Sequence, residues 1–335
     1  MRSLILFPLT LLAQPPSVGV LDFYGLRQVA QSDIRAALPF KEGDPLPPSK
    51  GDVEEALEQV KGVVRARLEA VCCQEGKAIL YVGIEERGAP HFEYNAPPTG
   101  IITVPEDVQT AYAEFHTAVN RAARTGSTSE NLSSGHSLLS DPGAREKQLN
   151  FIPLADKHLP LLRRVLKESS DAGHRAIAAY VMGYTRNKRQ AAVDLQLALR
   201  DPDDTVRNNA MRALGAIAVF AALQPPDVHM DDKIEVPATW FIETLDSLIW
   251  TDRAVALNVL VTLTERRDAK LMAHLKERSL PAIAEMARWK HLPHALPAFI
   301  LLGRIHGESE PAIQSAWSGS RDAFLKRLAA PPKRR

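Results

Sequence analysis

The most regular hydrophobic pattern of the chain lies in residues 201–220. Its apolar positions recur at the spacing of one helical face, and they are Val206, Ala210, Ala213, Leu214 and Ile217. Acidic side chains in the preceding turn, residues 201–204, lie where the helix dipole favours negative charge. Because a helix with such a small-residue stripe cannot bury it alone, the pattern predicts a stack of helices.

An earlier helix carries the same pattern. Arg175 and Gly183 align with Arg207 and Gly215 at an offset of 207 − 175 = 32 residues, a length that suits a two-helix unit. The proline-containing residues 223–237 are predicted to be an insertion on one face of this array and a candidate binding surface. Further helices, some of them irregular repeats or capping helices, are predicted at residues 157–168, 174–184, 190–199, 240–249, 253–265, 271–277, 281–289 and 296–305.

Residues 191–218 resemble a HEAT repeat, in particular the bacterial HEAT-like type that is also seen in phycobilin lyases. The resemblance is carried by Val193, Leu197, Leu199, the turn at 201–203, Val206, Arg207, Ala210, Ala213, Leu214 and Ile217. It implies an all-α helical-repeat domain, an α-solenoid, over residues 151–328. In such arrays the arginine braces the aspartate of the neighbouring turn. We therefore assign Asp201, Asp203 and Arg207 to a structural repeat turn.

The N-terminal part shows a different pattern. Residues 18–23 predict a strand, residues 33–38 a short helix, and Ser49 the start of a second helix with a capping-box-like beginning. Residues 64–72 alternate between apolar and polar side chains, and residues 78–84 return as a partner strand after a turn. The predicted fold is an α+β domain of the order β-α-α-β-β, over residues 18–87.

This domain resembles a POTRA domain, the polypeptide-transport-associated module of outer-membrane assembly and two-partner secretion proteins. The resemblance is carried by residues 20–25, by Ser32, Asp33, Ile34 and Leu38, by the turn at 41–45, and by the strands at 65–71 and 78–85. It implies that other chains bind by adding a strand to an exposed sheet edge. The alternative is a small α+β domain with no transferable role.

Residues 88–150 are predicted to be a linker that contains one helix, at 105–123, and a mobile polar loop, at 125–137. The N-terminal residues 1–17 have the layout of a secretory signal peptide: Arg2, an apolar run at 4–12, and a polar, proline-rich end. They predict an exported protein of a bacterial periplasm, without stable membrane insertion of the mature chain. Residues 329–335 are a basic tail.

Composition and motifs limit the chemistry. With 41 basic and 40 acidic residues the net charge is +1, which argues against nucleic acid as a partner. Phosphate-cradling, zinc-protease and nucleophile-elbow motifs are missing from the sequence. His291 and His294 are separated by Pro293 and predict no metal site. The adjacent Cys72 and Cys73 are expected to be thiols without a function. We therefore predict no catalytic, cofactor-binding or metal-binding residues.

These features favour a non-catalytic scaffold that binds another protein or a peptide through the sheet edge of the first domain and the surface of the helical array. One alternative is a lyase-like HEAT-repeat enzyme that acts on a bound cofactor or peptide, which requires a polar pocket with an acid or base of shifted pKa. The other is a cytosolic adaptor, if residues 1–17 are not a signal peptide.

Overall fold

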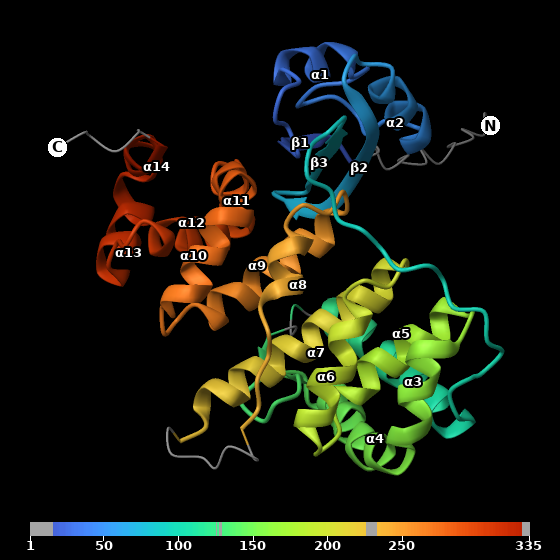
Figure 1. The fold of residues 1–335 in the computed structure, drawn as a ribbon. Helices are drawn as coiled ribbons and strands as arrows, with labels where there is room; N and C mark the ends of the chain where they lie inside the picture. Colours follow the sequence, from blue (N-terminus) through green and yellow to red (C-terminus); the bar gives the residue numbers. More distant parts are fainter. Residues whose placement is uncertain (1–15, 125, 127–128, 226–232, 330–335) are drawn as a thin grey trace, which may run out of the picture. The chain divides into compact units, whose positions relative to one another are not determined.

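The computed structural model describes residues 16–124, 126, 129–225 and 233–329. The chain divides into two compact units, Met1–Ala89 and Pro90–Arg335. A small sheet unit is followed by a helical unit, which confirms the fold class at this level (Figure 1). Residues 1–15 of the predicted signal peptide lie outside the described residues, as do residues 226–232 of the predicted insertion and residues 330–335 of the basic tail.

The elements of the first unit follow one another in the expected order of strand, helix, helix, strand and strand. In the sheet, the third strand lies in the middle. It runs parallel to the first strand and antiparallel to the second strand (Figure 1). The five elements are β1 (Val18–Tyr24), α1 (Gln31–Ala37), α2 (Lys50–Glu58), β2 (Val63–Gln74) and β3 (Lys77–Glu86).

The core of the first unit forms between the sheet and its two helices. Ile34 of α1 and Leu57 of α2 are fully buried against the strands. On β3 a Cβ atom at Gly83 would lie 2.5 Å from the ring of Tyr24, so this glycine makes room for a buried aromatic side chain. The Ser49 hydroxyl accepts a hydrogen bond from Asp52 N at 3.2 Å, which caps α2 as the sequence predicts.

A buried carboxylate closes the loop after β1. Glu86, at the end of β3, accepts hydrogen bonds from the backbone N–H groups of Arg27, Gln28 and Val29 at 2.7, 2.7 and 3.1 Å. The loop turns there at Gly25, whose φ is +84°.

The expectation of thiols in β2 is wrong for Cys73, which is disulfide-bonded.

The second unit starts before the predicted helical array. Residues 90–150, which the sequence assigns to a linker, belong to it. Helix α3 (Glu106–Arg124) and a short hairpin of β4 (Glu130–Asn131) and β5 (Leu138–Leu139) precede the array. Within the range predicted as a mobile loop, 125–137, Glu130 and Asn131 pair with Leu139 and Leu138. Asn131 Oδ1 accepts hydrogen bonds from both Ser133 N and Ser133 Oγ, at 2.9 and 2.8 Å, and these bonds fix the turn.

The helices then follow in series. Helix α4 has 27 residues and contains Pro153 and Pro160, so it begins well before the helix predicted at residues 157–168, and it packs on α3 and α5. The helices are α4 (Pro142–Glu168), α5 (Ala172–Met182), α6 (Lys188–Ala198), α7 (Asp204–Leu223), α8 (Thr239–Thr244), α9 (Trp250–Leu263), α10 (Ala269–Arg278), α11 (Leu280–Met286), α12 (Leu292–Ile305), α13 (Glu310–Gly319) and α14 (Arg321–Ala329).

In the central part, helices that are not consecutive in the chain pack against one another. Helix α5 contacts α7, α7 contacts α9, and α9 contacts α12. Small residues allow the close approach of α5 and α7, since a Cβ atom at Gly183 would lie 2.8 Å from the Cβ of Ala213. The face of α5 and α7 that α3 and the hairpin cover carries the cavity described below.

Candidate functional site

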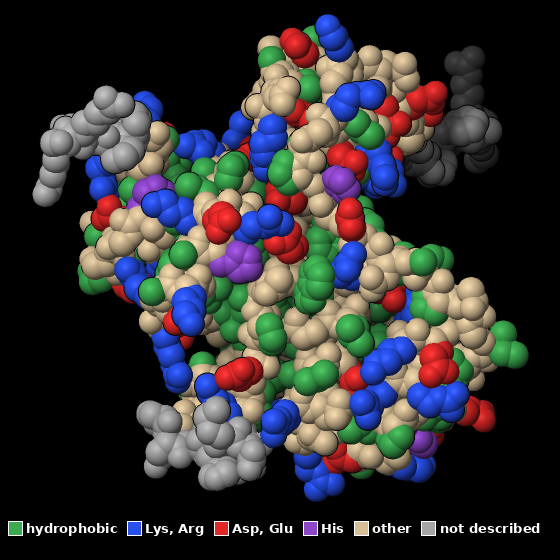
Figure 2. Space-filling view, in the orientation of Figure 1, with side chains coloured by type: hydrophobic (Ala, Val, Ile, Leu, Met, Phe, Trp, Pro, Cys, Tyr) green, Lys and Arg blue, Asp and Glu red, His purple; other side chains and the backbone are tan. Residues whose placement is uncertain are grey.

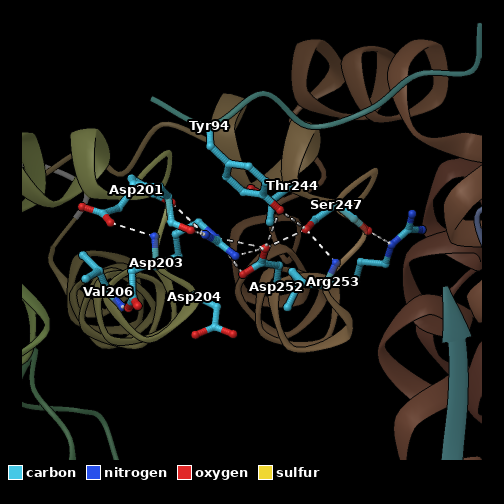
Figure 3. Close-up of polar contacts among 12 residues, drawn as sticks. Tyr94, Asp201, Asp203, Asp204, Val206, Thr244, Ser247, Asp252 and Arg253 are labelled. Carbon is cyan, nitrogen blue, oxygen red and sulfur yellow. Dashed lines mark hydrogen bonds and ion pairs between the residues drawn. The ribbon is translucent and has the colours of Figure 1, made fainter. Parts of the chain in front are cut away.

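The three residues assigned to the repeat turn all lie at the start of α7 (Figure 3). Asp203 is the N-cap of the helix and accepts a hydrogen bond from Val206 N at 3.0 Å. The carboxylate of Asp201 accepts two hydrogen bonds from Arg175, at 2.7 and 2.8 Å. Arg207 donates onward to Asp252 of α9. Each arginine therefore joins its helix to the start of the helix after next.

This turn occurs three times in the part of the chain that the structure describes. In each copy an arginine donates to the backbone carbonyl six residues before it, in the pairs Arg175–Ser169, Arg207–Asp201 and Arg253–Ser247. In each copy the side chain of that earlier residue also accepts a hydrogen bond from the N–H two residues after it, at Asp171, Asp203 and Ile249. The copies lie 207 − 175 = 32 and 253 − 207 = 46 residues apart. The third copy escaped the sequence analysis because of this longer spacing.

Tyr94 adds to the buried network around the third copy. Its hydroxyl lies 2.9 Å from the Ser247 hydroxyl, and its ring lies 4.3 Å from the guanidinium carbon of Arg207. Burial raises the pKa of Asp252, against the opposing effects of Arg207 and Ser247. Figure 3 shows Tyr94, Ser247 and Asp252 converging on one point. The side chains of this network bind to one another, so its role is to hold helices together.

Tyr94 belongs to an extended segment, residues 90–104, which we call the strap. The strap is hydrogen-bonded to the ends of helices in the array: Asn95 N donates to Arg200 O at 2.7 Å, and Gly100 N donates to Glu168 O at 2.8 Å. A Cβ atom at Gly100 would lie 2.6 Å from that same carbonyl oxygen, which explains the glycine. The strap thus braces the same helix ends as the arginine turns.

An open cavity of about 580 Å³ lies elsewhere in this unit, between α3, the β4–β5 hairpin, α5 and α7. We call it the aromatic groove. Aromatic rings form much of its lining, which also includes the amide of Asn209 and the charged side chains of Arg212 and Glu130. The aromatic side chains used in the argument are Tyr112, His116, Tyr180 and Tyr184.

The floor of the groove is rigid. The hydroxyls of Tyr180 and Tyr184 lie 3.0 Å apart, and Tyr184 donates to Ser137 O at 2.9 Å. Gln148, fully buried, donates to Tyr184 at 3.0 Å. Burial raises the pKa of both tyrosines, so the phenols stay protonated and hold the hairpin against α5. A preformed aromatic surface of this kind loses little entropy when it binds a ligand.

The upper part of the groove is polar. Asn209 donates to Ala176 O at 2.9 Å, which orients its amide. Arg212 and Glu130 face each other at 3.9 Å with half-exposed side chains. His116 is exposed, and partial desolvation lowers its pKa. A ligand in the groove therefore meets aromatic faces below and hydrogen-bonding groups above.

A second cavity, of about 540 Å³, lies on the other side of His136 and Tyr184, which line both cavities. We call it the Lys188 cavity. Lys188 is only 6% exposed, and its Nζ donates to Gly183 O at 2.7 Å and lies 3.3 Å from His136 Nδ1. Burial lowers the pKa of Lys188 to about 8, and burial together with Lys188 lowers that of His136 to about 4.

Neither cavity was predicted from the sequence. In the sequence, His116 and His136 have no partner at ligand spacing, and Tyr180 and Tyr184 belong to an ordinary helical stripe. The side chains come from separate elements, and His116 and Tyr180 lie 180 − 116 = 64 residues apart. A spacing rule has no access to such a constellation, and only the aromatic content of the α5 stripe gave a signal.

The edges of the sheet in the first unit were the other predicted binding surface. On β2, Ala66 N and Leu68 N donate to the carboxylates of Glu58 and Glu54 at 3.1 and 2.8 Å. On β1, Leu21 N donates to Glu42 Oε1 at 3.2 Å. These side chains occupy the positions that an added strand would use, a known means of protecting sheet edges.

No protein-family model matches the chain, and no curated protein matches it. Across the described ranges, His, Cys, Asp and Glu side chains do not form a group of three that could hold a metal ion. The helices of the same ranges are all too short or too polar to cross a lipid bilayer. On the face drawn in Figure 2, basic and acidic side chains are interspersed, in keeping with the net charge of +1.

Proposed function

We propose that the protein is an interaction scaffold, and that its helical unit binds a peptide or a segment of another protein in the aromatic groove. The proposal rests on the lining of this groove. Its tyrosine rings are held by hydrogen bonds, and they lie beside the oriented amide of Asn209 and the charged pair of Arg212 and Glu130. Aromatic side chains supply most of the binding energy at protein interfaces, and amide groups match the hydrogen-bonding pattern of a peptide backbone.

The architecture supports this proposal. Three copies of the arginine turn, together with the consecutive contacts of α5, α7, α9 and α12, favour a HEAT-like solenoid. The order β-α-α-β-β and the mixed sheet favour a POTRA-like first unit.

Export to the periplasm rests on the sequence of residues 1–17 alone. The absence of catalytic, cofactor and metal residues likewise remains a proposal.

Strand addition to the first unit is the weaker of the two binding modes that we propose. An incoming strand at the proximal half of β2 must displace Glu54 and Glu58 from the backbone N–H groups that they occupy. Beyond Leu68 the strand continues to Gln74, and this distal half is where we place any edge pairing. The groove needs no such displacement.

A peptide-display selection on the full-length chain tests the groove. Enriched peptides are then titrated against the double variant Tyr112→Ala/His116→Ala, which strips the α3 wall of the groove. The matched control, Thr117→Ala/Asn120→Ala, changes exposed residues of the same helix that do not line the groove. We expect the groove variant to lose at least about tenfold in affinity, near 1.4 kcal/mol, and the control to bind normally. Equal losses in both variants, or no enriched peptide, would refute the proposal.

A lyase-like enzyme is the second candidate, favoured by one observation. The Lys188 cavity holds an amine and an imidazole 3.3 Å apart, with pKa values lowered to about 8 and about 4, and groups of this kind act as acids and bases in catalysis. Mass spectrometry of peptides recovered after long incubation separates the candidates: a scaffold returns its ligand unchanged, whereas an enzyme returns a peptide of altered mass.

A further inference from the structure

Lys188 is a buried cation, and no carboxylate of the described residues lies at contact distance from it. Its ammonium group has three N–H donors, and the described residues supply two acceptors, Gly183 O and His136 Nδ1. Among the described residues, Asp156 of α4 is the acid whose charge acts on it. The carboxylate of Asp156 is itself held by Thr185 and by Arg186. One donor of Lys188 is therefore available to a ligand in the Lys188 cavity.

A buried charge of this kind destabilises the fold unless something pairs with it. One part of its role is structural, since Gly183 is the C-cap of α5 and a cation is favourable at a helix C-terminus. That role needs only one hydrogen bond and no cavity. The open space beside the amine is left without a structural explanation.

We propose that Lys188 and His136 form a carboxylate-binding subsite that is contiguous with the aromatic groove, and that it takes an acidic side chain or the C-terminal carboxylate of the bound segment. A carboxylate oxygen in the Lys188 cavity accepts the remaining N–H of Lys188 and restores charge balance. His136 lines both cavities, so a peptide that lies on the tyrosine rings reaches the amine past the imidazole.

The surroundings of the subsite are consistent with an anion. Helix α6 begins at Lys188, so its positive end adds to the field in the cavity. The basic side chains of Arg186 and Arg189 also line the cavity. The titratable groups that face the amine from its neighbours are His136 of the hairpin turn, Tyr184 after α5, and Asp156 of α4. Of these described groups only Asp156 is negative, and it is paired already.

Competitive labelling tests the subsite without a known partner. The amine of Lys188 in the full chain is labelled with trinitrobenzenesulfonate, with succinate or its dimethyl ester present, and the modified lysines are quantified by peptide mapping. We expect succinate to slow labelling of Lys188 at least about threefold, and the ester to have no effect. Lys147, a partly exposed lysine that pairs with Glu114, is the internal control. Equal labelling rates with and without succinate would overturn the subsite.

The inference rests on the proposed function, and peptides from the groove selection separate the two. Each peptide is titrated as free acid, as C-terminal amide, and with its acidic side chains changed to amides, against the unmodified chain and Lys188→Met. If the subsite exists, one of the neutral forms binds the unmodified chain at least about fivefold more weakly than the free acid. In Lys188→Met this difference between the charged and the neutral form disappears. Peptides that bind without any such preference overturn the subsite and leave the groove intact. If succinate protects Lys188 but the selection yields no binding peptide, the result supports the subsite and refutes the peptide-binding function.

Discussion

Arg207 of α7 donates to both carboxylate oxygens of Asp252 of α9, each at 3.0 Å, and neither side chain reaches solvent. The change Arg207→Met removes the cation and leaves the carboxylate buried without its charge partner. Breaking one side of a buried ion pair costs about 3–5 kcal/mol. We expect a loss of stability of this size in urea unfolding followed by tryptophan fluorescence, since all four tryptophans of the chain lie in the second unit.

Arg212→Met, five residues further along the same helix, is the matched control because the Arg212 side chain is 55% exposed. Its effect should stay within about 0.5 kcal/mol, as for most surface substitutions. If both variants unfold at the same urea concentration, the arginine turn does not carry the stability that we assign to it.

The strap gives a second prediction. Tyr94→Phe removes the hydroxyl that lies 2.9 Å from Ser247 Oγ and keeps the ring over Arg207. A lost buried hydrogen bond costs about 1–2 kcal/mol. Because the cost falls on the strap, hydrogen exchange at the amides of Asn95 and Gly100 should accelerate about tenfold. Tyr112→Phe, in the groove, should leave these two amides unchanged, and acceleration in both variants would argue against a local effect of Tyr94.

The turn after β1 gives a third prediction, with two glycines of positive φ as a matched pair. A Cβ atom at Gly25 would lie 2.0 Å from Ile84 O, whereas a Cβ at Gly43 meets no atom within 4 Å. Both alanine variants carry the cost of a left-handed conformation, about 1–2 kcal/mol, but only Gly25→Ala adds a clash with the backbone. We expect it to destabilise the first unit by at least about 4 kcal/mol in total.

Exchange of the β3 amides in the full-length chain measures this loss, because β3 is the central strand of the sheet. Gly43→Ala should lower the protection of these amides only by the factor of about 5–30 that about 1–2 kcal/mol corresponds to, far less than Gly25→Ala. Equal protection in the two variants would contradict the clash and would assign the whole effect to backbone conformation.

The sequence predicted local features of the fold well. The alternation in residues 64–72 identified β2, and the acidic turn before α7 identified the cap, because both features depend on neighbours a few residues away. Helix α4 starts at Pro142, well before the helix predicted at residues 157–168, and it contains Pro153 and Pro160. Packing on α3 and α5 offsets the local cost of prolines inside a helix.

The candidate site could hardly be predicted from the sequence, because the site is built from distant elements. The groove combines α3, the hairpin, α5 and α7, and the stripe that contains Tyr180 and Tyr184 is the same pattern that a plain core helix would have. Lys188 stands in the sequence as one of several basic residues between α5 and α6. Its burial, and with it the shift of its pKa, exists only after the hairpin has folded over it.

The pH dependence of stability gives a last prediction, which concerns Lys188. The pKa of its ammonium group falls from the usual 10.5 to about 8 in the folded protein. Between these two values the unfolded chain binds more protons than the folded chain, so the contribution of Lys188 to stability rises as the pH rises from about 8 to about 10. A shift of this size corresponds to about 3 kcal/mol over the full window. Lys188→Met lacks the titration, so the difference in unfolding free energy between the two proteins should change by this order between pH 7 and pH 10. Urea unfolding of both proteins across that range measures it, and a difference that is independent of pH would show that the buried ammonium keeps its usual pKa.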